Sequence, residues 1–550
     1  MKKNKFKKRG FNKRGKNSFN HENQRNFENR MEVREVSIDK ISLDLANKIV
    51  SVSGIIGKII QTKGPTIFSI SDATGTLSLK GFSKPGERAF PNLKEEDSIK
   101  AIIEIGEYQG EIEGEIKQIF KLTSQEHVEL VKNINHLQAK RAKVNEIPFL
   151  IKSPILDKLR HRFIKAAAEI RLAIIQQRPI IVRHHNDTDG YSAGFALESA
   201  ILPLIEKEQS SEKAGWEFFL RAPCSAPFYE IDDSIRDAAL SLRNLAKFSN
   251  KMPLVIIADN GSSPEDLLAI QHGKVHGMEF IVVDHHYSSK DVISPEVLTH
   301  INPFLVGEDG SRFSAGMLCT ELARLINSVK NIDQIPAMAG YADRIDLTNP
   351  EAVDDYLKIA KREGYSKELL HDISTVIDFV SSKIRFMEAR EYIKVIFGTP
   401  RENQKNLVTI MAPYIRKLEQ KGLAIAKSNA EIETIVETTL QKLDIENTFP
   451  GFGFFPKPGM LVGMLHDDLQ KSKKIEKLVS IGIMQSAITI RATDKANFSV
   501  HDLIEILNKE LPEAFVEGGG HKNAGSISFL PKKKDGVLKI LKHFIEDRSK

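Results

Sequence analysis

The chain has 550 residues, of which 41% are hydrophobic and 28% charged, a composition typical of globular proteins and a length sufficient for several domains. Only two cysteines, Cys224 and Cys319, are present, which excludes a disulfide framework and a cysteine-based zinc site. The formal net charge of +6 is unevenly placed, because residues 1–30 hold eleven Lys or Arg against two Glu and the remainder is slightly acidic.

The first segment, residues 1–35, is rich in Lys, Arg, Asn and Gly with isolated Phe and has no helical or strand period, so we predict a disordered basic tail. Such a tail can bind the phosphates of a nucleic acid or serve only to keep the protein in solution, and composition leaves both open. No apolar run is long enough to cross a bilayer, and no signal-peptide core follows the basic start. We therefore expect a cytoplasmic protein with no membrane contact.

Short alternating runs separated by glycine turns fill residues 45–123, for example KIVSVSGIIGKII and TIFSISDATGTLSL. Five predicted strands in so short a stretch favour a small closed barrel of the OB type, a fold that commonly binds single-stranded nucleic acid. The side chains expected to face such a strand are Phe68, Lys80 and Phe82. An all-β module without a ligand has the same strand pattern and stays open as an alternative.

The remaining chain changes from helical to mixed patterns. Residues 124–174 have a helical period and are predicted to form a linker. In residues 175–350, non-alternating apolar runs are followed by turn or helical segments, which indicates a parallel sheet covered by helices on both faces. Residues 351–450 are predicted to be a helical insert, and residues 451–550 a smaller α/β domain. The predicted fold class is therefore α/β, with a parallel-sheet domain, a smaller α/β domain, an N-terminal barrel and a helical insert.

Polar side chains follow three of the predicted parallel strands at the point where each strand ends. In open α/β sheets this edge binds ligands. Carboxylates gathered there would repel one another and raise one another's pKa unless cations neutralised them. Oxygen and imidazole ligands without thiolate favour two Mn²⁺ or Mg²⁺ ions, and such a pair suits phosphoester hydrolysis. The residues concerned are Asp187, Asp189, Asp259, Asp284, His185, His285 and His286.

These residues lie in recognisable motifs. The segments NDTDG, ADNG, VDHH and GYADRIDL resemble the four motifs of the DHH phosphoesterase superfamily, and VEGGGHKNAG resembles the glycine-rich motif of its DHHA1 substrate domain. The resemblance covers roughly residues 175–350 and 455–530. Together with the barrel and the basic tail, it makes the chain most similar to the archaeal RecJ-like single-strand exonucleases.

The resemblance implies a role for each motif residue. Asp259 is expected to bridge two metal ions, with Asp187 completing one and Asp189, His285 and Asp343 the other. His286 would contact the scissile phosphate, and Asp284 would orient the two histidines.

Two positions leave a choice. Several family members have a metal-binding histidine where this chain has Arg183, and we expect His185 to take over part of that role. The motif YADRID offers two aspartates; the motif match selects Asp343, and Asp346 is expected to be structural.

Further residues are expected to bind the substrate. The resemblance assigns Arg491 to a backbone phosphate. In GGGHKNAG, glycines without side chains let a phosphate approach the backbone and the histidine can donate a hydrogen bond to it, although a flexible turn would also explain three glycines. Ser314 opens a predicted helix whose amides can face a phosphate, and close helix packing would explain its small residues equally well. The glycine-rich residues are Gly518, Gly519, Gly520 and His521.

The predicted function is a metal-dependent exonuclease specific for single strands, which hydrolyses DNA, with RNA as a second substrate class, in replication or repair. One alternative is a nanoRNase or cyclic-dinucleotide phosphodiesterase acting on short substrates. Another is a scaffold in a replication complex with GINS and the replicative helicase, a partnership that can also coexist with activity.

Overall fold

The computed structural model describes residues 33–549 except 85, 109, 210–212, 225, 246–250, 289, 385–388, 450 and 452–453. Nearly all of the predicted basic tail therefore lies outside the described residues. The chain divides into two compact units, residues 1–135 and 136–550, and each is described by itself.

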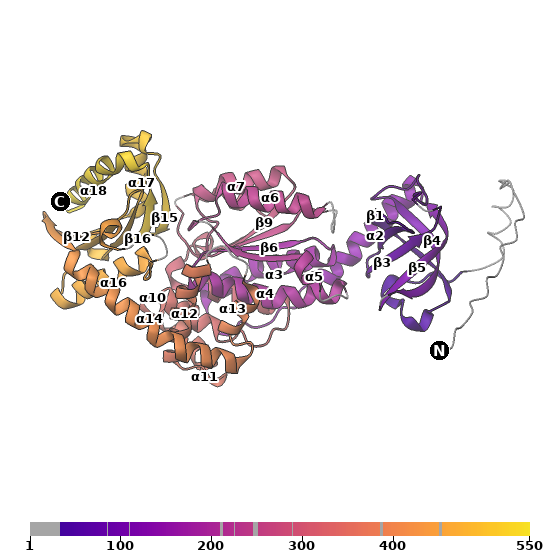
Figure 1. Ribbon diagram of the computed structural model, residues 1–550, viewed down its shortest axis with the longest axis horizontal. Coiled ribbons are helices and arrows are strands. Elements are labelled where there is room, and N and C mark those ends of the chain that lie inside the picture. The colour runs from indigo at the N-terminus through magenta and orange to yellow at the C-terminus, as the bar shows by residue number, and fades with distance from the viewer. Residues whose placement is uncertain are drawn as a thin grey trace, which may run out of the picture. The chain divides into compact units, whose positions relative to one another are not determined.

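The first unit contains a closed five-stranded barrel in the order β1-β2-β3-β5-β4, which confirms the predicted OB-type barrel (Figure 1). Alternating apolar residues of all five strands point into one core. The predicted turn between the second and third strands is held by Asp72, whose Oδ1 accepts hydrogen bonds from the amides of Thr74 and Gly75. The strands are β1 (Ile49–Gln61), β2 (Thr66–Ser71), β3 (Thr76–Gly81), β4 (Ser98–Tyr108) and β5 (Glu111–Lys121).

The expectation that Phe68 faces a nucleic-acid strand is wrong. In β2 every second residue points inward, and Phe68 belongs to that inward set with Thr66 and Ile70. Its side chain is fully buried and packs edge-on against Phe90, with 6.1 Å between the ring centres. Phe82, just past β3, does expose 59% of its surface.

Two helices follow the barrel in the region predicted to be a helical linker, α2 (Ser124–Ala142) and α3 (Pro154–Ile175). The buried face of α3 includes Leu159 and Phe163 and belongs to the core of the second unit.

The second unit is built around a five-stranded parallel sheet in the order β10-β9-β8-β6-β7, which confirms the predicted parallel sheet. Strands β6 and β8 are buried at every position because helices cover both faces. Figure 1 shows α6 and α7 on one face and α3 and α4 on the other. The elements are β6 (Ile180–His184), α4 (Thr188–Gln209), α5 (Ala214–Glu217), β7 (Phe219–Pro223), α6 (Ile231–Leu245), β8 (Leu254–Ala258), α7 (Pro264–Val275), β9 (Glu279–Val283), β10 (Thr299–Ile301) and α8 (Ala315–Ile326).

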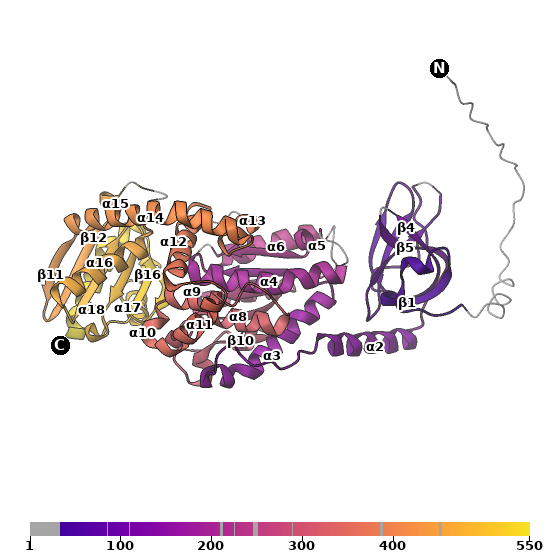
Figure 2. The ribbon, with the colours of Figure 1, turned by 90° about the horizontal axis from the view of Figure 1, so that it is seen from below.

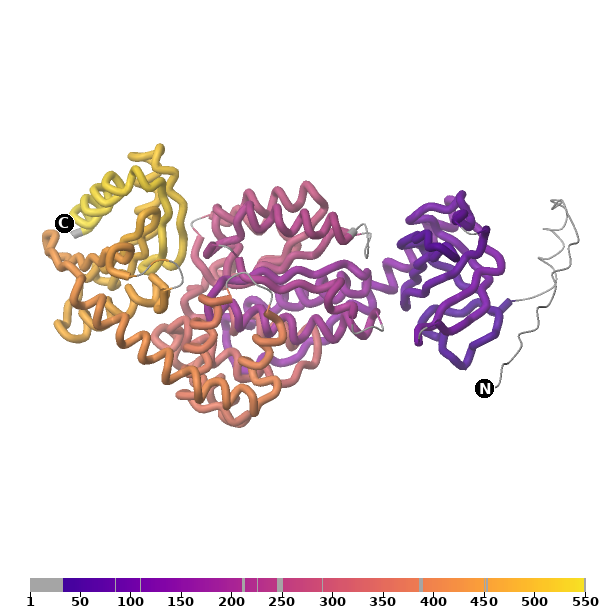
Figure 3. The backbone as a smooth tube through the Cα atoms, viewed as in Figure 1, coloured from indigo at the N-terminus to yellow at the C-terminus, as the bar shows by residue number. Residues whose placement is uncertain are grey.

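A helical region follows the sheet. Its last and longest helix is α14 (Arg401–Asn429). Figure 3 shows this helix running from the helical region to the C-terminal sheet, where it contacts α16 and β12. The helices are α9 (Ile335–Ala342), α10 (Ile345–Thr348), α11 (Pro350–Arg362), α12 (Lys367–Ile384), α13 (Arg390–Ile396) and α14 (Arg401–Asn429).

The predicted helical insert ends earlier than expected. Residues after α14 form two strands, β11 (Glu431–Ile435) and β12 (Thr438–Asp444), instead of the predicted amphipathic helix. The sequence EIETIVETTLQKLD is rich in β-branched residues, which favour strands. Pairing of β12 in parallel with β13 then fixes the strand, a tertiary interaction that local periodicity does not contain.

The C-terminal part is a smaller α/β domain with a six-stranded mixed sheet in the order β11-β12-β13-β14-β16-β15, in agreement with the predicted fold class (Figure 2). Separate apolar clusters join α16 to one face of this sheet and α17 and α18 to the other. The remaining elements are α15 (Ile445–Thr448), α16 (Pro458–Lys473), β13 (Leu478–Ile483), β14 (Ala487–Ala492), α17 (Val500–Glu510), β15 (Glu517–His521), β16 (Ala524–Ser528) and α18 (Lys534–Ser549).

Among the described residues, no helix combines the length and the apolar character needed to cross a membrane.

Candidate metal centre and phosphate-binding cavity

The titratable residues predicted at the strand ends meet at one edge of the parallel sheet. Asp187 follows β6 and precedes α4, Asp259 follows β8, and Asp284 begins the segment after β9. Asp259 has a left-handed backbone, with φ of 61°, which is uncommon for a residue other than glycine and frequent at functional sites. Its amide donates to the carbonyl of Val283, so the turn after β8 is tied to the end of β9.

Three of these residues form a first group of possible metal ligands, His185, Asp187 and Asp259. His185 Nδ1 lies 2.8 Å from Asp187 Oδ2 and 3.7 Å from Asp259 Oδ2. Burial opposes ionisation of Asp187, but the neighbouring His185 outweighs it and lowers the pKa of the Asp187 carboxyl. The amide of Gly190 fixes the other oxygen of Asp187 at 2.9 Å.

A second group consists of Asp189, Asp259 and His285, with Asp343 beside it. His285 Nε2 lies 3.3 Å from Asp259 Oδ1, 3.6 Å from Asp343 Oδ2 and 3.9 Å from Asp189 Oδ2. The other ring nitrogen, Nδ1, is 3.3 Å from the carbonyl of Gly310, to which it can donate in the neutral ring. That arrangement leaves the Nε2 lone pair facing the carboxylates, as in metal-binding histidines. Asp259 is common to both groups.

The start of α8 holds Asp189 in place. The amides of Ala315 and Gly316 donate to its two oxygens at 2.8 and 2.9 Å. Ser314 is the fully buried N-cap of this helix, with its hydroxyl facing the Met317 amide. The amides that we expected to face a phosphate are therefore occupied by the Asp189 carboxylate, and the expectation that Ser314 binds substrate is wrong.

These groups fit divalent metal ions. Asp259 Oδ2, His285 Nε2 and Asp343 Oδ2 are buried polar atoms without a hydrogen-bond partner within the described part of the chain. Burial first, and then the charges of Asp259 and Asp343, raise the pKa of Asp189 well above its usual value. Buried carboxylates and a free imidazole nitrogen directed at one another are costly unless a cation lies between them. All donor atoms are oxygen or nitrogen, which suits Mn²⁺ or Mg²⁺.

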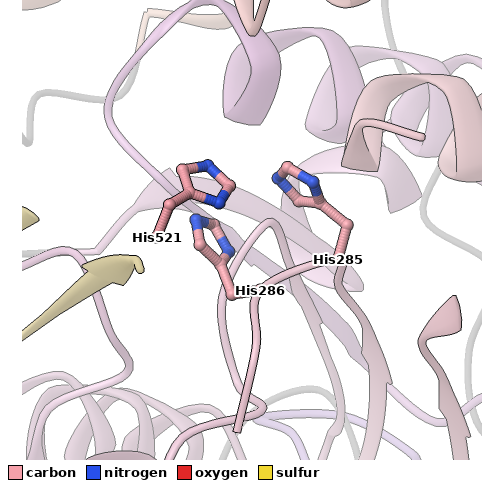
Figure 4. Close-up of side chains that lie close together, drawn as sticks. All are labelled: His285, His286 and His521. Carbon is pink, nitrogen blue, oxygen red and sulfur yellow. The ribbon is translucent and has the colours of Figure 1, made fainter. Parts of the chain in front are cut away.

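Three histidine rings from two domains adjoin this centre (Figure 4). The ring of His521, at the end of β15, stacks on His286 with 4.7 Å between ring centres and 27° between planes. It meets His285 edge-on at 5.3 Å, and its Nε2 lies 3.9 Å from Asp343 Oδ1. Asp284 Oδ1 lies 2.7 Å from His286 Nδ1 and fixes that ring. The glycine-rich motif of the C-terminal domain is thereby brought against the metal ligands.

Arg183 is turned away from the metal centre. Its Nε donates to Asp237 Oδ2 on α6 at 3.0 Å, and its Nη1 donates to the carbonyl of Pro223 at 3.1 Å. The Tyr229 hydroxyl donates to the same oxygen of Asp237. Arg183 is therefore a buried structural residue that joins the sheet to α6. The histidine close to Asp187 in this chain is His185, as the sequence suggested.

The two aspartates of YADRID differ in position. Asp343 is the C-cap of α9 and faces His285 and His521. Asp346 lies in α10, where its negative charge favours a higher pKa for the Tyr341 and His371 side chains.

A cavity of about 1,000 Å³ opens beside Asp343 and His521 and contains three basic side chains, Arg344, Arg491 and Lys522. Arg491, in β14, lines this cavity near the carboxylates of Asp343 and Asp467 without a hydrogen bond or ion pair to any described residue, so its guanidinium can donate to a phosphate. Arg344 was missed in the sequence, although it directly follows Asp343 in the same motif. Its Nη2 lies 3.1 Å from Asp467 Oδ2 on α16, and the pair joins the two domains at this cavity.

Strand pairing explains two of the three predicted phosphate-binding glycines. A Cβ at Gly518 would lie 2.5 Å from the carbonyl oxygen of Ser526, and one at Gly520 would lie 2.5 Å from that of Ala524. Gly519 alone has open space at the Cβ position, and it remains a candidate for phosphate approach.

Lys457 is a second residue that sequence reasoning missed. It precedes α16, and its Nζ donates to the carbonyl of Asn186 at 2.6 Å and to Ser381 Oγ at 2.7 Å. It thereby holds the segment directly before Asp187. No sequence motif marks it, because its partners lie far away in the chain.

Comparisons with known proteins place the chain in a family. No family model matches the chain. The uncharacterized protein MJ1198 of Methanocaldococcus jannaschii is 34% identical over 542 residues, which covers 94% of this chain and 70% of that protein. The solved DHH domain of PF0399, described as a member of a family of ribosomal proteins, is 34% identical with a TM-score of 0.72, over 77% of this chain and 99% of that one. The chain belongs to the DHH phosphoesterase family.

A more distant likeness is to RecJ of Thermus thermophilus in complex with Mn²⁺, which is 16% identical with a TM-score of 0.49, over 73% of this chain and 56% of that one. At that distance no shared activity follows.

Proposed function

We propose that this DHH phosphoesterase is a metal-dependent exonuclease that hydrolyses single-stranded DNA from an end, with RNA as a second substrate class, in DNA replication or repair. The observation that carries the proposal is Asp259, whose carboxylate belongs to both the His185 group and the His285 group of possible metal ligands. Asp343, beside the second group, lines the large cavity together with basic side chains. That arrangement suits a phosphodiester held between a metal centre and phosphate-binding cations.

The two ligand groups are suited to two divalent ions, Mn²⁺ or Mg²⁺, which would supply an activated water and stabilise charge on the phosphate. The protein's own side chains prepare the site for that chemistry. Asp284 fixes the His286 ring, and the α8 amides hold the Asp189 carboxylate in one orientation. The ligands are His185, Asp187, Asp189, Asp259, His285 and Asp343.

The substrate phosphates have their own partners. His286 and His521 form a stacked pair beside the metal ligands, where their ring nitrogens can donate to the oxygens of the scissile phosphate. Arg491, which makes no hydrogen bond or ion pair with the described residues, would bind a neighbouring phosphate of the strand with two parallel hydrogen bonds.

The barrel would bind the strand by stacking more than by charge. Lys80 is paired with Glu113, and Lys117 with Glu104 and Glu115, so these lysines are already neutralised. Aromatic side chains are nevertheless exposed near Lys80: Phe82 by 59% and Tyr108, over whose ring the Lys80 Nζ lies at 3.9 Å, by 56%. Bases of any sequence can stack on such rings.

A partnership with a replication complex containing GINS and the helicase would use the helical region. Ile410 and Tyr414 of α14 are exposed by 74% and 56%, which offers an apolar patch for such a contact.

The test is product analysis of DNA and RNA strands labelled at the 5′ or the 3′ end, incubated with Mn²⁺. We expect stepwise shortening of single strands in the wild-type protein and no hydrolysis by Asp259→Ala, which should still bind single strands. Preference for two- to four-residue strands over long ones would favour the small-substrate alternative. Activity that survives Asp259→Ala would contradict the assigned site.

A further inference from the structure

A second, smaller cavity of about 410 Å³ lies next to His286. Tyr287, His501 and Glu505 line both this cavity and the large one, so the two cavities adjoin at these side chains. Asp284 and His286 line the small cavity, whereas Asp343 and His521 line the large one. A phosphate held by the stacked His286 and His521 would therefore lie between the two cavities.

The small cavity contains a buried polar side chain that the protein itself does not satisfy. Asn260, next to Asp259, is 3% exposed and lines the cavity. Neither its Nδ2 nor its Oδ1 has a well-formed hydrogen bond within the described part of the chain, and the neighbouring Cys224 sulfur is only a weak partner. An unsatisfied buried amide costs free energy, so its persistence indicates a ligand that offers both a donor and an acceptor. Nucleobase edges carry such combinations.

Aromatic side chains stand at the same cavity. Phe228 lines it from the segment before α6, and Tyr287 lines it from the segment after β9. Tyr287 is 43% exposed and is held edge-on by Phe304 at 5.2 Å and by His501 at 5.9 Å. The half-buried Phe228 ring and the exposed Tyr287 ring lie beside the buried Asn260 amide. This combination suits a flat heterocycle, which can stack on a ring and form hydrogen bonds with the amide.

The charge of the cavity disfavours a phosphate chain. No Lys or Arg lines it, whereas Arg344, Arg491 and Lys522 line the large cavity. The start of α7, an obvious place for an anion, is already capped by Asp266, whose Oδ2 accepts from the Ser263 amide at 2.8 Å. The cavity therefore suits an uncharged base and sugar.

We propose that this cavity binds the base and sugar of the terminal nucleotide while the rest of the strand occupies the large cavity, an inference that rests on the proposed exonuclease function. A volume of about 410 Å³ lies near the lower end of the range of roughly 300–1,000 Å³ for small-ligand sites. It suits one nucleoside rather than several, so each cleavage at His286 releases a mononucleotide.

The test compares three single strands with the wild-type protein and Mn²⁺: one unmodified, one lacking the base of the terminal nucleotide at the degraded end, and one lacking a base several positions inside. We expect kcat/KM to fall about 5- to 150-fold for the terminal abasic strand, the range that stacking of one base supplies. The internal abasic site should have a smaller effect on the first cleavage. The first products should be mononucleotides.

Phe228→Ala and the matched variant Leu347→Ala locate the effect. Leu347 is exposed and lines only the large cavity of the two, so its variant should keep the wild-type ratio between unmodified and terminal abasic strands. Phe228→Ala should bring that ratio toward one. Equal kcat/KM for unmodified and terminal abasic strands in the wild-type protein would overturn the cavity assignment and leave the exonuclease function intact. Absence of any strand hydrolysis would overturn both.

Discussion

His286 Nδ1 lies 2.7 Å from Asp284 Oδ1, and the same carboxylate oxygen accepts hydrogen bonds from the amides of His285 and His286. One buried carboxylate thus fixes both the ring and the backbone of the histidine pair. Asp284→Asn preserves the size of the side chain and removes the charge. We expect kcat to fall about 10- to 100-fold, the usual effect of removing a residue that orients a ligand, with KM for the strand little changed. Steady-state kinetics on a labelled strand measures both. A fall in kcat/KM caused only by KM would contradict the orienting role.

The two aspartates of YADRID provide a matched pair. Asp343 faces His285 and His521, whereas the charge of Asp346 affects the pKa of Tyr341 and of His371, outside the metal centre. We expect Asp343→Asn to raise the Mn²⁺ concentration needed for half-maximal activity at least about tenfold, because a ligand loses its charge. Asp346→Asn should stay close to wild type. Equal Mn²⁺ dependence of the two variants would contradict the assignment.

Arg183 contributes to stability rather than to metal binding. It is 6% exposed, and its removal leaves the carboxylate of Asp237 buried without its cation. Arg183→Met is expected to lower the free energy of unfolding by roughly 3–5 kcal/mol, as for other broken buried ion pairs. Denaturant unfolding followed by circular dichroism measures the loss. The Mn²⁺ dependence of the folded variant should match wild type, and a changed metal dependence at unchanged stability would place Arg183 in the site after all.

His300 makes stability depend on pH. It is 4% exposed between the hydroxyls of Ser262 and Ser294, and burial lowers the pKa of His300 to about 4. In the unfolded chain His300 has its ordinary pKa of about 6.5, so below that pH the unfolded state binds a proton that the folded state does not. Above pH 6.5 the ring is neutral in both states and this destabilisation is absent. Stability is therefore lost as the pH falls from 6.5 through 4, by at most about 3 kcal/mol. Unfolding free energies at pH 7.5 and 4.5 should differ less in His300→Gln than in wild type, and an unchanged difference would contradict this origin.

The strand-end residues could be predicted because they depend on local pattern. A largely apolar run without alternation predicts a buried parallel strand, and the carboxyl ends of such strands share one edge, so Asp187, Asp259 and Asp284 were expected to lie close together. The outward position of Phe82 and the inward position of Phe68 depend on strand register, which a short alternating run of β-branched residues does not fix.

Other features depend on segments that meet only in the folded chain. The α8 amides reach Asp189 across 126 residues of sequence, and Lys457 reaches Asn186 across 271. The residues of β12 also fit a helical period, and they form a strand because they pair with β13. Sequence patterns contain the candidate ligands but not the partners that orient them.

The most direct test of the central claim is Mn²⁺ binding to the full chain by isothermal titration calorimetry, with Asp259→Ala beside the wild type. Because Asp259 belongs to both groups of ligands, the wild-type protein should bind two ions per chain and the variant fewer than two, with weaker affinity for any that remains. Two ions bound with unchanged affinity by Asp259→Ala, or none bound by the wild type, would contradict the metal centre described for this edge of the sheet.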